Sequence, residues 1–295
     1  MKFVFIVNPI PAINRNPTRI MEWINEIWSA TGIDYEIMQT TKSGDGTPLA
    51  RRAVENGATV VVAVGGDGTI NEVAQGIINT DTALGIVPAG SGNGFARNLR
   101  IPLKPRDAIE ALKSLKFRQL DAGKINNHYF FNVAGAAFDA DVTHRFARTT
   151  MRGPLPYFYA AIREYFQYTP RRVVLEFDDK KIRRAPLLLS FANLPEFGNN
   201  AMIAPNARPD DGLMDLCILS PIREFGKAVK QVPRLFDGTI DEMPEMEIYQ
   251  TRKVIVKRYS DGPIHTDGEA LMEKAILEVE MLPGVLKLAV GEKVI

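Results

Sequence analysis

The sequence predicts an α/β N-terminal domain, with a parallel sheet flanked by helices, followed by a β-rich antiparallel sandwich. In the first ~120 residues, short apolar runs alternate with segments of helical periodicity. These runs are continuous, which is typical of strands covered on both faces. After about Gln119, short strands are separated by two-residue polar turns such as Asn126-Asn127, which is typical of antiparallel hairpins. We therefore place a boundary near residue 122, with domains at 1–122 and 123–295. Packing of the last few residues back on the first domain stays open.

Strands and helices alternate in the first domain. Asn16 and Pro17 provide a cap and a first-turn proline for a helix that ends at Gly32. The expected strands are Lys2–Val7, Asp34–Met38, Thr59–Val64 and Ala83–Val87, and the further helices are Pro48–Asn56, Ile70–Asn79, Phe95–Leu99 and Pro105–Leu115. The strands expected in the second domain are Leu120–Ile125, His128–Asn132, Val173–Phe177, Ile182–Phe191, Leu213–Leu219, Val254–Arg258, Ala275–Met281 and Leu286–Val290.

The composition is that of a soluble globular protein. Of the 295 residues, 45% are hydrophobic and 24% are charged, and the net charge is +1. No apolar run approaches the ~18 residues that cross a bilayer, and the start MKFVFIV is too short for a secretory signal. The single Cys217 excludes an internal disulfide and a cysteine-based metal cluster. We expect a cytoplasmic protein. The net charge of +1 gives no reason to expect a nucleic acid partner.

The stretch GGDGTINE at 65–72 leaves an apolar strand and opens a helix. Ligands of parallel α/β sheets bind at the carboxyl ends of strands, and a glycine-rich helix N-terminus favours phosphate. Asp67 would repel a phosphate unless Mg²⁺ lay between them. A second loop, Pro88–Gly94, repeats the strand, the glycine-rich turn and the helix. A tight turn explains either loop alone, but the two together predict a phosphate-binding site.

The usual mononucleotide and dinucleotide motifs, G-x-x-x-x-G-K-[ST] and G-x-G-x-x-G, are absent. GGDGTINEVAQGI at 65–77 instead resembles the diacylglycerol kinase catalytic domain family, which includes bacterial soluble lipid kinases and sphingosine kinases. NAD kinases and phosphofructokinases are more distant relatives. The resemblance covers nearly the whole chain through Asn8-Pro9, Thr40 with Gly44-Asp45, Pro88–Asn93, Asp121–Gly123, Phe131-Asn132, Ala204-Pro205, Pro209–Leu213 and Asp267–Glu269.

This resemblance implies an ATP- and Mg²⁺-dependent lipid kinase that phosphorylates the hydroxyl of a lipid such as diacylglycerol or a sphingoid base. It implies a structural Mg²⁺ held by the carboxylate of Asp211 and the backbone carbonyls of Arg208 and Leu213, with Asp215 in support. The nucleotide contacts that it implies are Asn8, Thr40, Gly65, Gly66, Asp67, Gly68, Thr69, Ile70, Asn71 and Ser91.

The motif Asp267-Gly268-Glu269 places two carboxylates two residues apart, on one face if the motif lies on a strand. A partly buried glutamate with a raised pKa can accept a proton near neutral pH. The resemblance implies that Glu269 is the proton acceptor for the lipid hydroxyl, with Asp267 beside it, and that Asp67 places Mg²⁺ or the reacting groups. Taken alone, the motif is better explained as a glycine-containing β-turn with solvated acids, and the resemblance is what favours catalysis.

Two features depart from the family pattern. The family usually continues Asn-Pro with Ser-Gly-x-Gly, whereas this chain has Ile10-Pro11-Ala12-Ile13-Asn14, so a phosphate contact from this first loop stays open. The second loop, Gly90–Gly94, is closer to the sphingosine kinase style. Among the histidines, His128, His144 and His265 have no metal-ligand spacing and are expected to be structural or exposed.

The segment Pro154–Pro170 contains six aromatic residues in one expected helix, and Arg171-Arg172 follow it. Aromatic side chains with flanking cations suit a membrane surface, from which a lipid kinase takes its substrate. Peripheral membrane association is therefore expected. A core helix or a homodimer helix with solvated arginines explains the segment equally well, whereas RNA binding lacks an accompanying motif.

Two alternatives to a lipid kinase remain. An NAD kinase has a similar glycine motif, but the motifs of the second domain fit it poorly. A non-catalytic lipid- or nucleotide-binding regulatory protein on the same scaffold is supported by the missing glycines after Asn8-Pro9. The presence of Asp67, Asp211 and Glu269 favours an enzyme.

Overall fold

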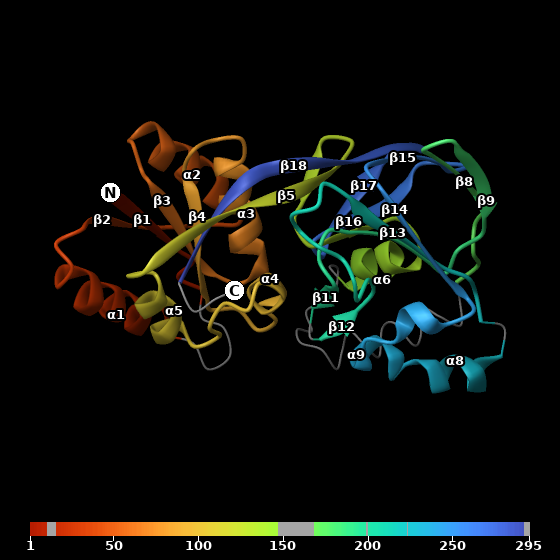
Figure 1. Cartoon of the computed structure of the whole chain (residues 1–295), viewed down its shortest axis with the longest axis horizontal. Helices are drawn as coiled ribbons and strands as arrows, with labels where there is room; N and C mark the ends of the chain where they lie inside the picture. The colour runs from red at the N-terminus through yellow and green to blue at the C-terminus, as the bar shows by residue number, and fades with distance from the viewer. Residues whose placement is uncertain (11–15, 147–167, 199, 223, 292–295) are drawn as a thin grey trace. The chain divides into compact units, whose positions relative to one another are not determined.

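The computed structural model describes residues 1–10, 16–146, 168–198, 200–222 and 224–291 (Figure 1). The chain divides into two compact units. Unit 1 consists of Met1–Leu120 and Gly284–Ile295, and unit 2 consists of Asp121–Pro283. The chain passes from one unit to the other twice, within the strands β5 (Leu115–Ile125) and β18 (Ile276–Gly291).

Unit 1 is built on a sheet with the strand order β2-β1-β3-β4-β18, in which every neighbouring pair is parallel. The strands β1 (Lys2–Val7), β3 (Val60–Gly65) and β4 (Ala83–Pro88) are almost wholly buried, and β2 spans Asp34–Gln39. The order of the strands along the chain changes direction between β1 and β3. Open α/β sheets bind ligands at the carboxyl ends of the strands beside such a switch point.

Helices cover both faces of this sheet (Figure 1). On one face, α1 (Pro17–Ser29) contacts α5 (Pro105–Ala111), and on the other, α2 (Gly46–Glu55) contacts α3 (Asp67–Ile77). The short α4 spans Gly94–Asn98. As the sequence predicts, the side chain of Asn16 caps α1, accepting a hydrogen bond from the backbone N–H of Arg19 at 3.3 Å. The predicted α/β fold of this part of the chain is confirmed.

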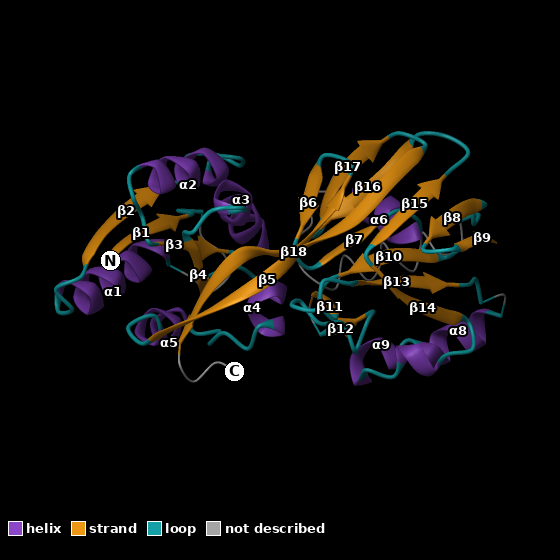
Figure 2. Cartoon of the chain, turned by 45° about the horizontal axis from the view of Figure 1, so that its top comes forward, coloured by secondary structure: helices purple, strands orange, loops and turns teal. Residues whose placement is uncertain are grey.

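Unit 2 is an antiparallel sandwich, as predicted (Figure 2). One sheet has the order β14-β13-β10-β7-β16-β17, and the other contains β18-β15-β8-β9 together with β5 and β6. Leu175, Phe191, Leu216 and Val256, which come from both sheets, belong to one buried core. The strands not yet located are β6 (His128–Phe130), β7 (Val133–Gly135), β8 (Val173–Phe177), β9 (Lys180–Arg184), β10 (Leu188–Ala192), β13 (Met214–Leu219), β14 (Met246–Thr251), β15 (Lys253–Lys257), β16 (Gly262–Thr266) and β17 (Glu269–Glu273).

A second buried cluster includes Val142 of helix α6 (Phe138–Phe146) and Cys217 of the six-stranded sheet, so α6 packs against that sheet. Cys217 is fully buried, as expected for a core residue. The smaller elements of unit 2 are β11 (Glu196–Gly198), β12 (Ala201–Met202), α8 (Phe225–Gln231), α9 (Arg234–Asp237) and η1 (Ile240–Glu242).

Some predicted elements differ from the structure. The segment Ile182–Phe191 forms two strands rather than one, because Pro186 cannot donate a ladder hydrogen bond. The two strands predicted from Ala275 to Val290 are instead a single strand, β18. The predicted aromatic helix lies largely at residues 147–167, outside the described residues. In the described parts of the chain, no helix is long and apolar enough to span a membrane.

Candidate functional site

The two glycine-rich loops of unit 1 touch each other at Gly66 and Gly90. A Cβ atom on Gly90 would lie 2.4 Å from the Cα of Gly66, and one on Gly66 would lie 3.2 Å from the Cα of Gly90. The backbone N–H of Ala89 donates to the carbonyl of Gly65 at 2.7 Å, which continues the β3–β4 pairing into the loops. Asn93 closes the second loop, because its side chain exchanges two hydrogen bonds of 2.9 Å with the backbone of Gly90. Only glycine allows this close approach of two backbones.

Asp67 connects the first loop to the helix after the second loop. It is the first residue of α3, and its Oδ1 accepts a hydrogen bond from the backbone N–H of Phe95 at 3.1 Å. Phe95 lies in the first turn of α4, where backbone N–H groups lack an intrahelical partner. The carboxylate of Asp67 therefore has a structural role, which is to hold α4 against the first loop. Its role with Mg²⁺ stays a prediction.

The end of β1 joins the same group of residues. The Nδ2 of Asn8 donates to the Oγ1 of Thr69 at 3.2 Å, and the Oδ1 of Asn8 accepts from the backbone N–H of Ile10 at 3.0 Å. A Cβ on Gly65 would lie 2.5 Å from the Thr69 hydroxyl, so this position also requires glycine. The predicted residues from β1 and β3 thus meet at the switch point of the sheet. The altered loop after Asn8-Pro9 lies mostly at residues 11–15, outside the described residues.

Glu72, the last residue of GGDGTINE, holds a third loop. Its carboxylate accepts hydrogen bonds of 2.8 Å from the backbone N–H groups of Gly44 and Gly46. Thr40 precedes this loop and is buried, and its N–H donates to the carbonyl of Val7 at the end of β1. Thr40 is among the predicted nucleotide contacts, whereas Glu72 is not, although Glu72 stands in the motif GGDGTINE that led to the prediction.

The predicted nucleotide residues differ in exposure. Gly68 and Ser91 are exposed, Gly66 and Asp67 are half-buried, and Thr69, Ile70 and Asn71 are buried. The exposed Gly68 lies in the first turn of an eleven-residue helix, and a Cβ there would meet nothing within 4 Å. Free backbone N–H groups, the positive end of the helix dipole and open space suit a phosphate group. The residues present therefore fit the triphosphate of ATP.

In unit 2, Asp267 and Gly268 form a two-residue turn between β16 and β17, and Thr266 pairs with Glu269. The φ angles of Asp267 and Gly268 are 50° and 86°, as a type I′ hairpin turn requires. Asp267 is half-buried, and its carboxylate accepts hydrogen bonds from the backbone N–H groups of Phe131, Asn132 and Val133 at 2.8, 2.8 and 3.1 Å. Asp267 therefore fixes the turn.

Glu269 is placed differently from the expectation. It is exposed, whereas a partly buried glutamate was expected, and it does not share a strand face with Asp267, which lies in the turn. The turn nevertheless holds Glu269 at the first position of β17. Asp267 and Glu269 are neighbours, as predicted, but Asp267 is bound by backbone N–H groups whereas Glu269 is exposed.

The predicted metal loop is held by Asp121. The Oδ2 of Asp121 accepts from the N–H of Gly212 at 2.7 Å, and its own N–H donates to the carbonyl of Pro209 at 2.7 Å. The exposed Asp211 accepts from the N–H of Leu213 at 3.0 Å. Burial and the charge of Asp211 raise the pKa of Asp215, while a hydrogen bond with Gln250 opposes the change.

These carboxylates give the loop excess negative charge and oxygen donors, which suit Mg²⁺. No group of three or more histidine, cysteine or acidic side chains that could hold a metal occurs within the described ranges. A site here would therefore depend on backbone carbonyls, such as those of Arg208 and Leu213, beside the Asp211 carboxylate.

A buried polar cluster was missed by the sequence analysis. Asp139, on α6, accepts hydrogen bonds from the hydroxyl of Ser190 at 2.9 Å and from the N–H of Ala137 at 3.0 Å. The Nε2 of His265 lies 3.4 Å from the same carboxylate. Gly135 makes room, because a Cβ there would lie 1.9 Å from the Oδ2 of Asp139. His265 is therefore structural, as expected, and it anchors β16, the strand that precedes the Asp267 turn.

Comparison with known proteins agrees with these features. The family model described as diacylglycerol kinase catalytic domain matches residues 2–125, and that of the YegS C-terminal NAD kinase beta sandwich-like domain matches residues 132–290. The chain is 33% identical over 272 residues to "Probable lipid kinase YegS-like" of Chromohalobacter salexigens, covering 88% of this chain and 85% of the relative. It is 28% identical over 244 residues to a diacylglycerol kinase of Staphylococcus saprophyticus, covering 81% and 79%.

Solved structures share the fold. A diacylglycerol kinase from Bacillus anthracis superposes with a TM-score of 0.75 at 19% identity, covering 100% of this chain and 98% of that chain. An NAD kinase from Archaeoglobus fulgidus in complex with ATP gives a TM-score of 0.54 at 14% identity, covering 99% and 95%. The two matched domains define a lipid kinase by class. The chain belongs to the diacylglycerol kinase catalytic domain family, as its motifs predict.

Proposed function

We propose that the protein transfers the γ-phosphate of ATP, with Mg²⁺, to the hydroxyl of a lipid such as diacylglycerol or a sphingoid base. The observation that carries this proposal is the contact of two glycine-rich loops at Gly66 and Gly90 beside the switch point of a parallel sheet. Such an edge favours a phosphate ligand. Residues 1–122 then act as the nucleotide-binding domain, to which Gly284–Ile295 return, and the rest of residues 123–295 act as the lipid-binding domain.

The nucleotide would be held mainly by backbone. The first turn of α3, from Asp67 to Thr69, offers N–H groups to the phosphates, and Ser91 in the second loop is exposed for a further contact. Glu72 orders the loop of Gly44 and Gly46, on which the adenosine side would rest. Asn8 aligns Thr69 through its amide. These groups are in place before the ligand binds, which lowers the cost of ordering.

Bound Mg²⁺ would neutralise negative charge that develops on the phosphates. Asp67 has one oxygen on the N–H of Phe95 and keeps a second oxygen, so it can serve the phosphate site without releasing α4. The Asp211 loop in unit 2, with the carbonyls of Arg208 and Leu213, would hold a structural Mg²⁺.

In the transfer, the lipid hydroxyl oxygen forms a bond to the γ-phosphorus while the bond to the β,γ-bridging oxygen breaks, and ADP leaves. Glu269 would take the proton of the hydroxyl, since its carboxylate is exposed to an incoming substrate. Asp267 is a positioning residue in this scheme, because its carboxylate is occupied by three backbone N–H groups.

We further propose a cytoplasmic enzyme that associates peripherally with a membrane, since its substrate is a membrane lipid. The test is incubation with ATP labelled at the γ-phosphate, Mg²⁺ and a panel of lipids in mixed micelles, with NAD⁺ as a competing acceptor. We expect the label to appear in one lipid class. The label should be lost when Mg²⁺ is removed and when Glu269→Gln replaces wild type. Label in NAD⁺ alone would favour an NAD kinase, and ATP binding without transfer would favour a regulatory protein.

A further inference from the structure

Unit 2 contains a pocket whose lining residues have no assigned part in the proposed transfer. Its lining includes Arg171 and Arg172, which precede β8, and Arg258, which follows β15. Small residues, among them Ala136 and Gly262, also line it and leave space between the arginines. Gly262 begins β16, and the Asp267 turn follows the far end of that strand, about 13 Å away at ~3.3 Å per residue. The pocket is therefore separate from Glu269.

The charge of the pocket is unbalanced. Three arginines face a single carboxylate, that of Asp141. Burial lowers the pKa of Arg258, and the charge of Arg171 lowers it further, against the opposing effects of Asp261 and Glu273. The Nε of Arg258 is buried and has no hydrogen-bond partner among the described residues. The positive charge of the pocket lies mainly on the exposed Arg171 and Arg172, because Asp141, Asp261 and Glu273 all act on Arg258.

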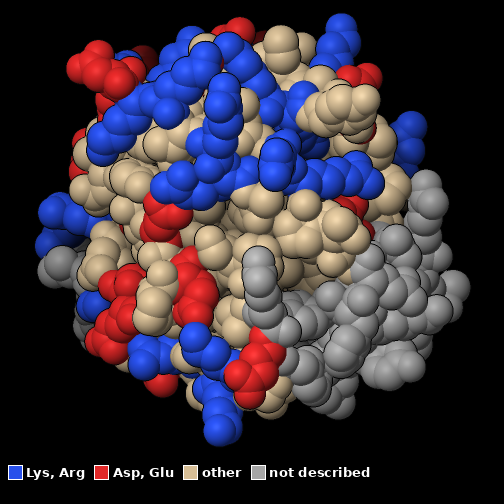
Figure 3. Space-filling model, turned by 90° about the vertical axis from the view of Figure 1, so that its right-hand side faces the viewer, with Lys and Arg blue, Asp and Glu red and all other residues tan. Residues whose placement is uncertain are grey.

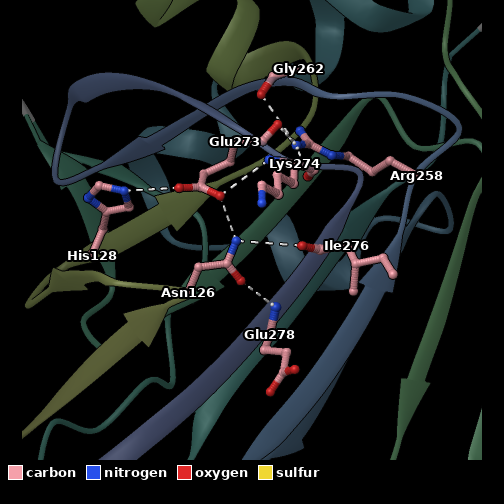
Figure 4. A network of polar contacts seen from close by, with 8 residues as sticks. All are labelled: Asn126, His128, Arg258, Gly262, Glu273, Lys274, Ile276 and Glu278. Atoms are coloured by element: carbon pink, nitrogen blue, oxygen red, sulfur yellow. Dashed lines mark hydrogen bonds and ion pairs between the residues drawn. The ribbon is translucent and has the colours of Figure 1, made fainter.

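Arg258 also holds the neighbouring hairpin (Figure 4). Its Nη1 donates to the carbonyl of Pro263 at 2.9 Å, and its Nη2 donates to the carbonyls of Glu273 and Lys274 at 2.9 and 2.7 Å. These bonds fix the open end of the β16–β17 hairpin, and the turn at the other end carries Asp267. A ligand in the pocket would therefore lie next to the hairpin that carries Glu269.

More basic residues lie close to the pocket. Strand β9 contains Lys180, Lys181, Arg183 and Arg184, of which Lys181 is paired with Glu176 and Arg184 with Glu247. Val173 of β8, which lines the pocket, pairs with Arg184. Figure 3 shows Lys and Arg side chains gathered on the upper part of the face that carries β8 and β9. A surface of this charge attracts an anionic bilayer.

Arginine side chains bind phosphate through paired, charge-assisted hydrogen bonds, which lysine and neutral donors match poorly. We propose that Arg171 and Arg172, which line this pocket, bind the phosphate group of a phospholipid headgroup, while Arg258 holds the wall of the pocket. This site is separate from Glu269, the proposed proton acceptor. The exposed basic residues on β9 favour a headgroup in a bilayer over a free phosphate as the source.

The test compares Arg171→Gln/Arg172→Gln with Lys180→Gln/Lys181→Gln. Both pairs are exposed and remove the same charge, but the lysines lie at the other end of the β8–β9 hairpin and do not line the pocket. Arg258 is left unchanged because it supports the hairpin. Binding is measured by flotation with phosphatidylcholine vesicles, with and without phosphatidylglycerol. No ATP is added, so the result does not depend on turnover.

We expect wild-type binding to require phosphatidylglycerol, and the arginine pair to lose about tenfold more affinity than the lysine pair. Equal losses of vesicle affinity in both variants would overturn the proposed phosphate site, since binding would then depend only on the total positive charge of the surface. Inorganic phosphate and the deacylated headgroup serve as soluble ligands. If these bind wild type as well as vesicles do, and fail with the arginine pair, the headgroup assignment is overturned. Unchanged melting temperatures establish folding, and Arg172→Gln alone replaces the pair if it unfolds.

Discussion

The Oδ1 of Asp67 lies 3.1 Å from the backbone nitrogen of Phe95 and accepts its hydrogen bond. This bond fastens the first glycine-rich loop to the helix that follows the second loop. One carboxylate therefore has two tasks, because it holds two loops in register and also lies where phosphates and Mg²⁺ are proposed to bind. The two tasks can be separated by mutation.

Asp67→Asn should separate them. Asparagine keeps a carbonyl oxygen for the N–H of Phe95, so the melting temperature should stay near that of wild type. Loss of the negative charge should lower kcat by about a hundredfold or more. Steady-state kinetics and thermal unfolding of the same preparation check both halves. Full activity in Asp67→Asn would show that the charge has no role in transfer.

Gly90→Ala should destabilise unit 1. The new Cβ would lie 2.4 Å from the Cα of Gly66, a backbone atom that cannot turn aside. Overpacking of this kind costs about 1–3 kcal/mol. Urea unfolding measures the loss, with Gly68→Ala as the control because a Cβ at Gly68 meets nothing within 4 Å. Equal stability of Gly90→Ala and wild type would contradict the contact between the loops.

Gly68→Ala should have the opposite profile. Alanine in the first turn of α3 should leave the free energy of unfolding unchanged or raise it by about 0.5–1 kcal/mol. A methyl group over the N–H groups of that turn should weaken Mg²⁺-ATP binding about tenfold. Calorimetric titration gives the dissociation constant. An unchanged constant would place the phosphates elsewhere.

The two acids of the Asp267-Gly268-Glu269 motif should respond differently. Asp267→Asn presents an amide to three N–H donors and should cost about 1–3 kcal/mol of stability. Glu269→Gln, at an exposed position, should leave the melting temperature unchanged and lower kcat by about a hundredfold or more. Unfolding and kinetic measurements on both variants decide the roles. Wild-type turnover by Glu269→Gln would remove it from catalysis.

The ion pair of Arg184 and Glu247 should give a pH-dependent term in stability. The hydrogen bond from Arg184 lowers the pKa of Glu247 below its ordinary 4.5, helped by Tyr249 and opposed by burial. An acid with a lowered pKa in the folded state stabilises the fold above its unfolded pKa and loses that contribution as pH falls.

Glu247→Gln should therefore cost about 1 kcal/mol at neutral pH, because the pair is partly exposed. The difference from wild type should shrink below pH 4.5, the ordinary pKa of the group. Urea unfolding across the acid range measures it. A difference that grows toward low pH would have the wrong sign.

Much of the fold could be predicted because it depends on local pattern. Apolar runs marked β1, β3 and β4, and the two glycine-rich loops stood at the ends of β3 and β4. Asp267-Gly268 is the residue pair that a type I′ turn favours, and the structure has that turn.

Long-range contacts could not be predicted from pattern. The three N–H groups on Asp267 come from residues more than 130 positions earlier in the chain. The pairing of Asp139 with His265 depends on how α6 packs on its sheet, and no spacing of residues in the sequence predicts it. The arginine pocket likewise joins Arg171, which precedes β8, and Arg258, which follows β15. Such partners are set by tertiary packing, so single-residue patterns carry no signal for them.

The return of β18 to unit 1 sets an order of events during protein synthesis. Strand β4 pairs with β18 at Leu84 and Leu288, and all of unit 2 lies between these residues in the chain. A nascent polypeptide therefore exposes β4 as an open sheet edge until the ribosome has made the entire sandwich. Open edges invite pairing between molecules. A fragment of residues 1–120 should consequently aggregate when expressed alone, whereas fusing residues 284–291 to it through a short linker should keep it dispersed.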